Sequence, residues 1–91
     1  MTNANEAAAA DWLRKDMERI AEDVHISWMR QRAAEGWRWG ERYSREEKTS
    51  PLMTDYALLP ESEKEVDRST VRQVAASLLR LGYQIERREE G

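Results

Sequence analysis

The sequence contains no cysteine and no phenylalanine, and it has a single histidine, His25. Without cysteine there are no disulfides, no thiolate metal sites and no cysteine nucleophile. One histidine leaves too few ligands for a zinc site, and no paired-carboxylate or nucleophile motif accompanies it. We therefore expect no metal, no cofactor and no enzymatic activity.

Long hydrophobic runs are also missing. The longest apolar run near the start is four alanines, which is too short for a membrane span or a signal peptide. The 18 acidic residues outnumber the 15 basic ones, giving a net charge of −3, whereas a nucleic-acid binder normally carries a basic face. The 91 residues suffice for one domain with a thin core. These features predict a cytoplasmic protein that binds neither membranes nor nucleic acid.

The first half of the chain has a helical pattern. No Gly or Pro occurs from Glu6 to Glu35, and an apolar stripe recurs every three or four residues at Leu13, Met17, Ile20, Val24 and Trp28. Gly36 is placed to end this helix in a left-handed conformation. Thirty helical residues would span about 45 Å. For so small a domain we expect either a break before residue 16 or an overhang.

A second helix is expected to begin near Asp67 as its N-cap, after a short helical turn at Pro60 or Ser62, and to stop at Gly82. Its apolar stripe comprises Val71, Val74, Ala75, Leu78 and Leu79. Residues 84–87 are a candidate strand, with residues 37–39 as the candidate partner. The predicted fold is mainly α, with two long antiparallel helices, a Trp-rich connector and the option of a small two-stranded β element.

Short motifs follow one another in a specific order between residues 16 and 86. They are Ile20-Ala21, His25-x-x-Trp28, Gly36-Trp37-x-Trp39-Gly40, Lys48-x-x-Pro51-Leu52, Tyr56-x-x-Leu59-Pro60-Glu61-Ser62-Glu63-Lys64, Asp67-Arg68 and Leu81-Gly82-Tyr83-x-Ile85. In this order they resemble the ryanodine-receptor repeat, or RyR domain. Trp39, Ser50 and Asp55 depart from the residues usual at those positions, and all three lie in the connector.

The resemblance implies a compact, mainly helical module over residues 16–86. Residues 1–15 would then be an N-terminal helical extension or a disordered segment, and residues 87–91 a disordered tail. Similar copies occur as standalone bacterial or phage proteins, and the bacterial copies resemble sensors of nucleotide-type ligands. The resemblance carries no channel activity to this chain, because the sequence has no membrane span.

The candidate ligand-binding residues are aromatic, basic and histidine side chains: Trp28, His25, Trp39, Trp37, Arg32, Arg42 and Tyr56. Trp28 could either pack or stack a planar base, whereas for Trp37 we favour packing against the helix. His25 could contact a ligand, or it could hydrogen-bond a backbone carbonyl and order the turn at residues 36–40. Trp12 lies outside the resemblance and is expected to make a packing or dimer contact.

Charged residues near the aromatic set leave two interpretations open. The arginine fork suits phosphate, and Arg32 or Arg42 is the candidate contact. The alternative is a solvated loop, because acidic residues are interleaved with the cations Arg32, Arg38, Arg42, Arg45 and Lys48. We interpret the acidic run Glu61, Glu63, Glu65 and Asp67 as a solvated helix start, with Asp67 as a cap and Lys64 as an ion-pair residue.

Two hypotheses on function follow. The first is a non-enzymatic sensor that binds a nucleotide or nucleotide-derived signal, with Trp28 stacking on the base, Tyr56 and Trp39 forming the wall and Arg32 or Arg42 meeting phosphate. The alternative is a protein-interaction or structural module without a small ligand, acting through a homodimer or another partner.

Overall fold

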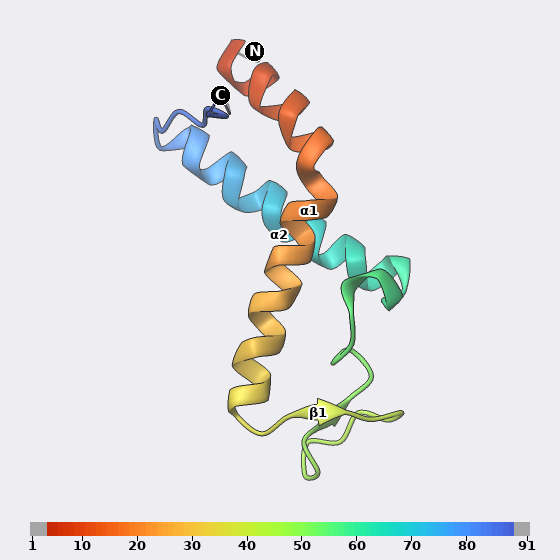
Figure 1. Ribbon diagram of the computed structural model, residues 1–91. Coiled ribbons are helices and arrows are strands. Elements are labelled where there is room, and N and C mark those ends of the chain that lie inside the picture. Colours follow the sequence, from red (N-terminus) through yellow and green to blue (C-terminus); the bar gives the residue numbers. More distant parts are fainter. Residues whose placement is uncertain (1–3, 89–91) are drawn as a thin grey trace.

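The structure is a computed structural model that describes the backbone of residues 4–88 and the side chains of residues 13–88. It has two long helices, α1 (Ala4–Ala34) and α2 (Glu61–Arg80), a 3-10 turn η1 (Tyr56–Leu58) and two short strands, β1 (Arg38–Trp39) and β2 (Thr49–Ser50). In Figure 1, α2 crosses α1 obliquely, and β1 lies beyond the C-terminal end of α1. The mainly helical class with a small two-stranded sheet is confirmed. The predictions for the Trp12 side chain and for residues 89–91 lie outside the described residues.

Both helices end as the sequence predicts. Gly36 and Gly82 have positive φ angles of 95° and 96°. After α1, the Gly36 N–H donates to the Ala33 carbonyl at 3.0 Å and the Trp37 N–H donates to the Arg32 carbonyl at 3.0 Å. The Tyr83 N–H makes the equivalent bond to the Leu78 carbonyl after α2. These are Schellman ends, and each satisfies carbonyls that the helix leaves unpaired.

The predicted start of the second helix at Asp67 is wrong. α2 begins at Glu61, directly after Pro60, and continues without interruption to Arg80. The Pro60 carbonyl accepts hydrogen bonds from the N–H groups of Glu63 and Lys64, so the short turn expected there is the first turn of α2 itself. Nothing between residues 61 and 81 breaks a helix, and Glu61 and Glu63 suit the positive end of the helix dipole. Asp67 therefore lies inside the helix, where it cannot act as a cap.

The predicted pairing of residues 84–87 with residues 37–39 is also wrong. β1 pairs in parallel with β2, with Arg38 opposite Thr49 and Trp39 opposite Ser50. Residues 83–88 form no strand. The reason is distance, because α1 has 31 residues, about 46 Å of helix, and separates β1 from the segment that follows α2 (Figure 1). Ile85 instead packs in an apolar groove between the helices.

The core lies where the connector meets the middle of α1. Ala21 on α1 is fully buried, and Tyr56 and Leu59 pack on it with Leu52 beside them. This confirms that residues 56–59 return to the core. Over the described residues, no helix combines the length and apolar character needed to cross a membrane. The small core thus fixes η1 against α1 and places the start of α2 beside His25 and Trp28.

Candidate functional site

A hollow of about 210 Å³ lies between α1, the connector and the first turns of α2. We call it the His25 pocket, and it is lined by His25, Trp28, Leu52, Leu59, Glu63, Val66 and Asp67. Residues three or four apart share one face of a helix, so α1 contributes the pair 25/28 and α2 contributes the set 63/66/67. The two leucines come from the connector. The pocket therefore requires α2 to cross α1 at this point.

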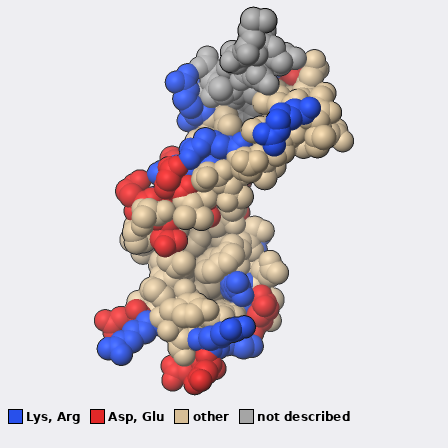
Figure 2. All heavy atoms as spheres, turned by 180° about the vertical axis from the view of Figure 1, so that it is seen from behind, with Lys and Arg blue, Asp and Glu red and all other residues tan. Residues whose placement is uncertain are grey.

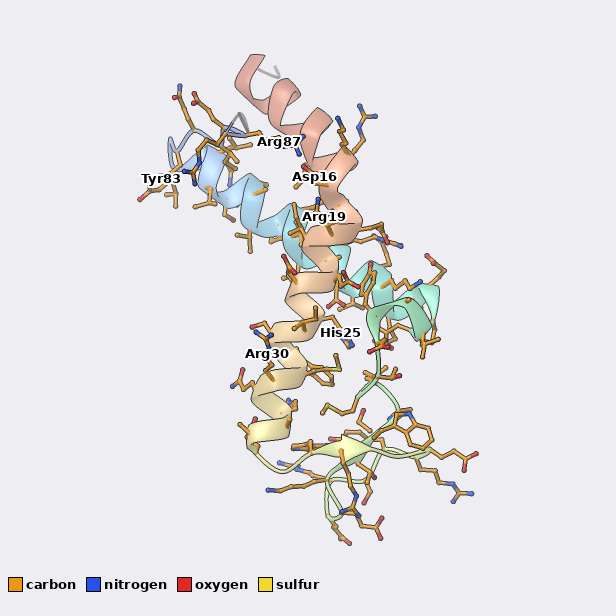
Figure 3. All side chains as sticks on the ribbon, in the orientation of Figure 1. Asp16, Arg19, His25, Arg30, Tyr83 and Arg87 are labelled. Atoms are coloured by element: carbon orange, nitrogen blue, oxygen red, sulfur yellow. The ribbon has the colours of Figure 1, made fainter. Side chains whose placement is uncertain are left out.

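His25 anchors the connector at the back of the pocket. Its side chain is almost completely buried, and Nε2 lies 2.7 Å from the carbonyl oxygen of Thr54. Because a carbonyl oxygen only accepts, Nε2 carries a proton and donates it. Figure 3 shows His25 pointing from α1 toward the segment that leads into η1. The hydrogen bond to a backbone carbonyl is confirmed, but it orders residue 54 and not the turn at residues 36–40.

Trp28 forms an aromatic wall of the pocket. Its ring stacks beside His25, with the ring centroids 5.7 Å apart and an angle of 22° between the planes. The guanidinium of Arg32 lies 5.8 Å from the Trp28 ring and 5.5 Å from the Trp37 ring. Trp37 in turn contacts Tyr43 at 5.6 Å. Arg32 thus contacts both indoles by cation–π attraction and pairs with the Glu35 carboxylate at 4.0 Å, and it adjoins the pocket through Trp28 without lining it.

Glu63 and Asp67 give the pocket its charge. They lie one turn apart on α2 and both line the hollow. Burial raises the pKa of Asp67; the nearby Glu63 charge adds to this, and His25 opposes it. Among the described residues, no side chain donates a hydrogen bond to either carboxylate, and no Lys or Arg lines the hollow. The pocket therefore combines apolar walls with two carboxylates that lack donors.

The remaining predicted site residues lie elsewhere. Trp39, on β1, is 58% exposed and does not line the pocket. The side chain of Arg42 is exposed in the loop, where its carbonyl accepts a hydrogen bond from the Thr49 hydroxyl. Tyr56 is buried behind the pocket, with its ring 6.2 Å from that of His25. The structure thus brings His25, Trp28 and Arg32 together and leaves Trp39 and Arg42 apart from them.

The two lysines near the site, Lys48 and Lys64, each bind a protein oxygen. Lys48 adopts a positive φ of 57°, and its ammonium donates to the Glu35 carbonyl at 2.7 Å, just beyond the end of α1. On α2, Lys64 forms the predicted ion pair, with Glu61 at 3.6 Å. On the face shown in Figure 2, positive and negative side chains intermix. The connector therefore presents no continuous basic surface on that face.

Sequence reasoning missed Glu63, Asp67 and the apolar residues Leu52, Leu59 and Val66 as pocket residues. The acidic residues were assigned to a solvated helix start. The i, i+3, i+4 spacing of Glu63, Val66 and Asp67 does place them on one helical face. That signal becomes informative only if α2 begins at Glu61, because otherwise residues 63–67 belong to a turn.

Residues 3–87 match the family model of the RyR domain. The match covers most of the chain, so the protein belongs to the RyR domain family. The matched region also includes residues before position 16, and hence the whole of α1.

Proposed function

We propose that this RyR domain is a non-enzymatic binding module that recognises a nucleotide or nucleotide-derived signal. The observation that carries the proposal is the His25 pocket, where the rings of Trp28 and His25 line one hollow with the carboxylates of Glu63 and Asp67. Binding sites typically join apolar and aromatic walls with a few placed polar groups. We further propose that the protein acts in the cytoplasm, which its lack of cysteine fits.

The size of the pocket suits one ring and not a whole nucleotide. Its volume of about 210 Å³ is below the roughly 300–1,000 Å³ of clefts that enclose drug-sized ligands. The carboxylates oppose entry of phosphate, since like charges in a partly buried site repel. In the proposed complex the base enters against Trp28, and the sugar and phosphate remain outside, on the side of Arg32. Arg32 lies beside Trp28 on that side, and a phosphate there would compete with the Glu35 carboxylate for its guanidinium.

Binding is best measured by calorimetry with a panel of nucleoside monophosphates and cyclic dinucleotides. We expect saturable binding by the wild type and a roughly 5- to 150-fold loss for Trp28→Ala, because base stacking contributes about 1–3 kcal/mol. Trp39→Ala is the matched control, since Trp39 lies outside the pocket. A folded wild type that binds no member of the panel would contradict the proposal.

A second candidate function is pairing with another copy of the chain. An apolar groove of about 300 Å³ runs between α1 and α2, lined by Leu13, Ile20, Val24, Thr70, Val71, Val74, Ala75, Leu78 and Ile85. Val74 and Leu78 remain 54% and 37% exposed at this groove. A second copy presents the same side chains, so a two-fold arrangement would bury both grooves together. Light scattering at high micromolar concentration tests it: a dimer that Val74→Glu disrupts is expected, and a strict monomer contradicts it.

A further inference from the structure

The segment that follows α2 crosses the apolar groove between the two helices. Figure 1 shows α1 and α2 diverging beyond their crossing, with the chain after α2 turning back toward the first half of α1. Ile85 on this segment is half-buried and lines the groove together with Leu13 and Leu78. Leu13 lies early on α1 and Leu78 lies late on α2. Ile85 therefore fills the end of the groove where the helices separate.

A second contact joins the same segment to α1. The Arg87 guanidinium pairs with the Asp16 carboxylate at 4.0 Å, and Figure 3 shows Arg87 reaching toward Asp16. Residues 84–88 form neither helix nor strand. Among the described residues, no hydrogen bond joins residues 84–88 to the rest of the chain. One apolar side chain and one ion pair therefore hold this segment in place.

A segment held by so few contacts opens at low cost. Local opening is easiest where backbone hydrogen bonds and buried apolar contacts are few, and an ion pair between partly exposed groups contributes little. A helix with its side chains is about 10–12 Å across. A helix of a second copy therefore cannot lie along the full groove while Ile85 fills one end. Val74 and Leu78 stay exposed at the groove with the segment in place, so they offer a first contact.

We infer that residues 84–88 form a strap that competes with a second copy of the chain for the apolar groove. This inference rests on the second candidate function, pairing through that groove, and adds a regulator to it. With the strap closed, Ile85 covers one end of the groove and pairing is weak. With the strap open, the whole groove is free for the second copy. Because each copy opens its own strap, the dimer dissociation constant varies with the inverse square of the open fraction.

Sedimentation equilibrium of the full chain measures this competition. Ile85→Ser removes the apolar contact of the strap, and Arg87→Glu reverses the charge of its ion pair. For a strap that is open about 10–50% of the time, its loss lowers the dimer dissociation constant by roughly 4- to 100-fold. Leu81→Ser and Arg88→Glu are the matched controls and should keep the wild-type value. Leu81 is 76% exposed and does not line the groove, and Arg88 is exposed beside Arg87.

A charge exchange separates the strap from general destabilisation. Asp16→Arg combined with Arg87→Glu restores the ion pair in reverse, so the dissociation constant should return toward the wild-type value. An Ile85→Ser variant that pairs no more tightly than the wild type would overturn the strap and leave pairing through the groove standing. If neither the wild type nor any variant associates at high micromolar concentration, the strap and the pairing are both wrong. Nucleotide binding is measured separately by calorimetry, so none of these results bears on it.

Discussion

At the scale of single residues, one carboxylate joins three elements of the fold. Glu18 on α1 accepts hydrogen bonds from Arg68 Nε and Nη2 on α2, both at 2.7 Å, and from the Tyr56 hydroxyl of η1 at 3.0 Å. Arg68 also pairs with Glu61 at 3.1 Å. This network lies beside the small core and holds α2 against α1, which is the arrangement that the His25 pocket needs.

Removing the Tyr56 hydroxyl tests how much this network stabilises the fold. Tyr56→Phe keeps the buried ring and loses one hydrogen bond, so we expect the free energy of unfolding to fall by about 0.5–1.5 kcal/mol. Tyr83→Phe is the matched control, because Tyr83 is 62% exposed. Its effect should stay within about 0.5 kcal/mol. Equal effects of the two substitutions in urea unfolding would contradict the role given to the network.

The same carboxylate gives the fold a pH dependence. The hydrogen bond from Arg68 lowers the pKa of Glu18 below its usual value of 4.5; burial opposes this, and the Tyr56 hydroxyl adds to the lowering. The unfolded chain therefore binds a proton on Glu18 more readily than the folded chain does. The stability that Glu18 contributes is complete above pH 4.5 and is lost as the pH falls through the lower folded pKa.

Glu18→Gln should show this contribution directly. At neutral pH we expect a loss of about 1 kcal/mol or less, because solvent screens the partly exposed carboxylate. The difference between variant and wild type should shrink in thermal melts performed progressively below pH 4.5. Glu22→Gln, one turn along α1 and exposed, serves as the control. A difference from wild type that is independent of pH would show that the Glu18 charge does not stabilise the fold.

At the scale of elements, local signals predicted helix ends well and long-range pairing poorly. Gly36 and Gly82 end their helices because glycine adopts a positive φ without steric strain, and a glycine is visible in the sequence alone. The predicted pairing of residues 84–87 with residues 37–39 was wrong because the two segments lie at opposite ends of α1, which local sequence patterns do not reveal. The start of α2 was wrong because Asp67 has the chemistry of a cap, whereas Pro60 begins the helix without a side-chain hydrogen bond.

The small sheet depends on a close approach at Gly40. A Cβ atom at this position would lie 2.6 Å from the Cβ of Thr49, which is buried and donates its hydroxyl hydrogen bond to the Arg42 carbonyl. Gly40→Ala should therefore force β1 and β2 apart and cost about 1–3 kcal/mol in chemical denaturation. Gly82→Ala meets no atom within 4 Å and reports only left-handed backbone strain. A Gly40→Ala variant as stable as the wild type would exclude this close packing.

In the candidate site, too, the residues that depend on local spacing could be predicted and those that depend on the crossing of the helices could not. Its α1 half, His25 and Trp28 with Arg32 at the edge, could be predicted because residues three and four apart on one helix are neighbours whatever the rest of the chain does. The α2 half could not, because Glu63 and Asp67 reach the pocket only through the crossing of the two helices. Trp39 was placed in the wall on the basis of nearness in sequence, but β1 leads it away from α1.

At the scale of the whole molecule, α1 serves two separate surfaces. Its middle carries the His25 pocket, and its Leu13–Val24 portion forms one side of the apolar groove with α2. The molecule is elongated, with extents of 49 × 31 × 23 Å, and the pocket and the groove follow one another along α1 and α2. Figure 2 shows charges of both signs along the elongated body, with uncharged surface between them.

The central claim is that a base binds against Trp28, and the indole N–H signals of the four tryptophans in a nitrogen–proton correlation spectrum test it most directly. The signals are assigned with Trp28→Phe and Trp39→Phe, and the nucleotide that binds most tightly in calorimetry is then titrated into the wild-type chain. We predict a saturable shift of the Trp28 signal while the Trp39 signal stays in place. A Trp28 signal that does not move at saturating nucleotide, in a folded protein, would contradict the account.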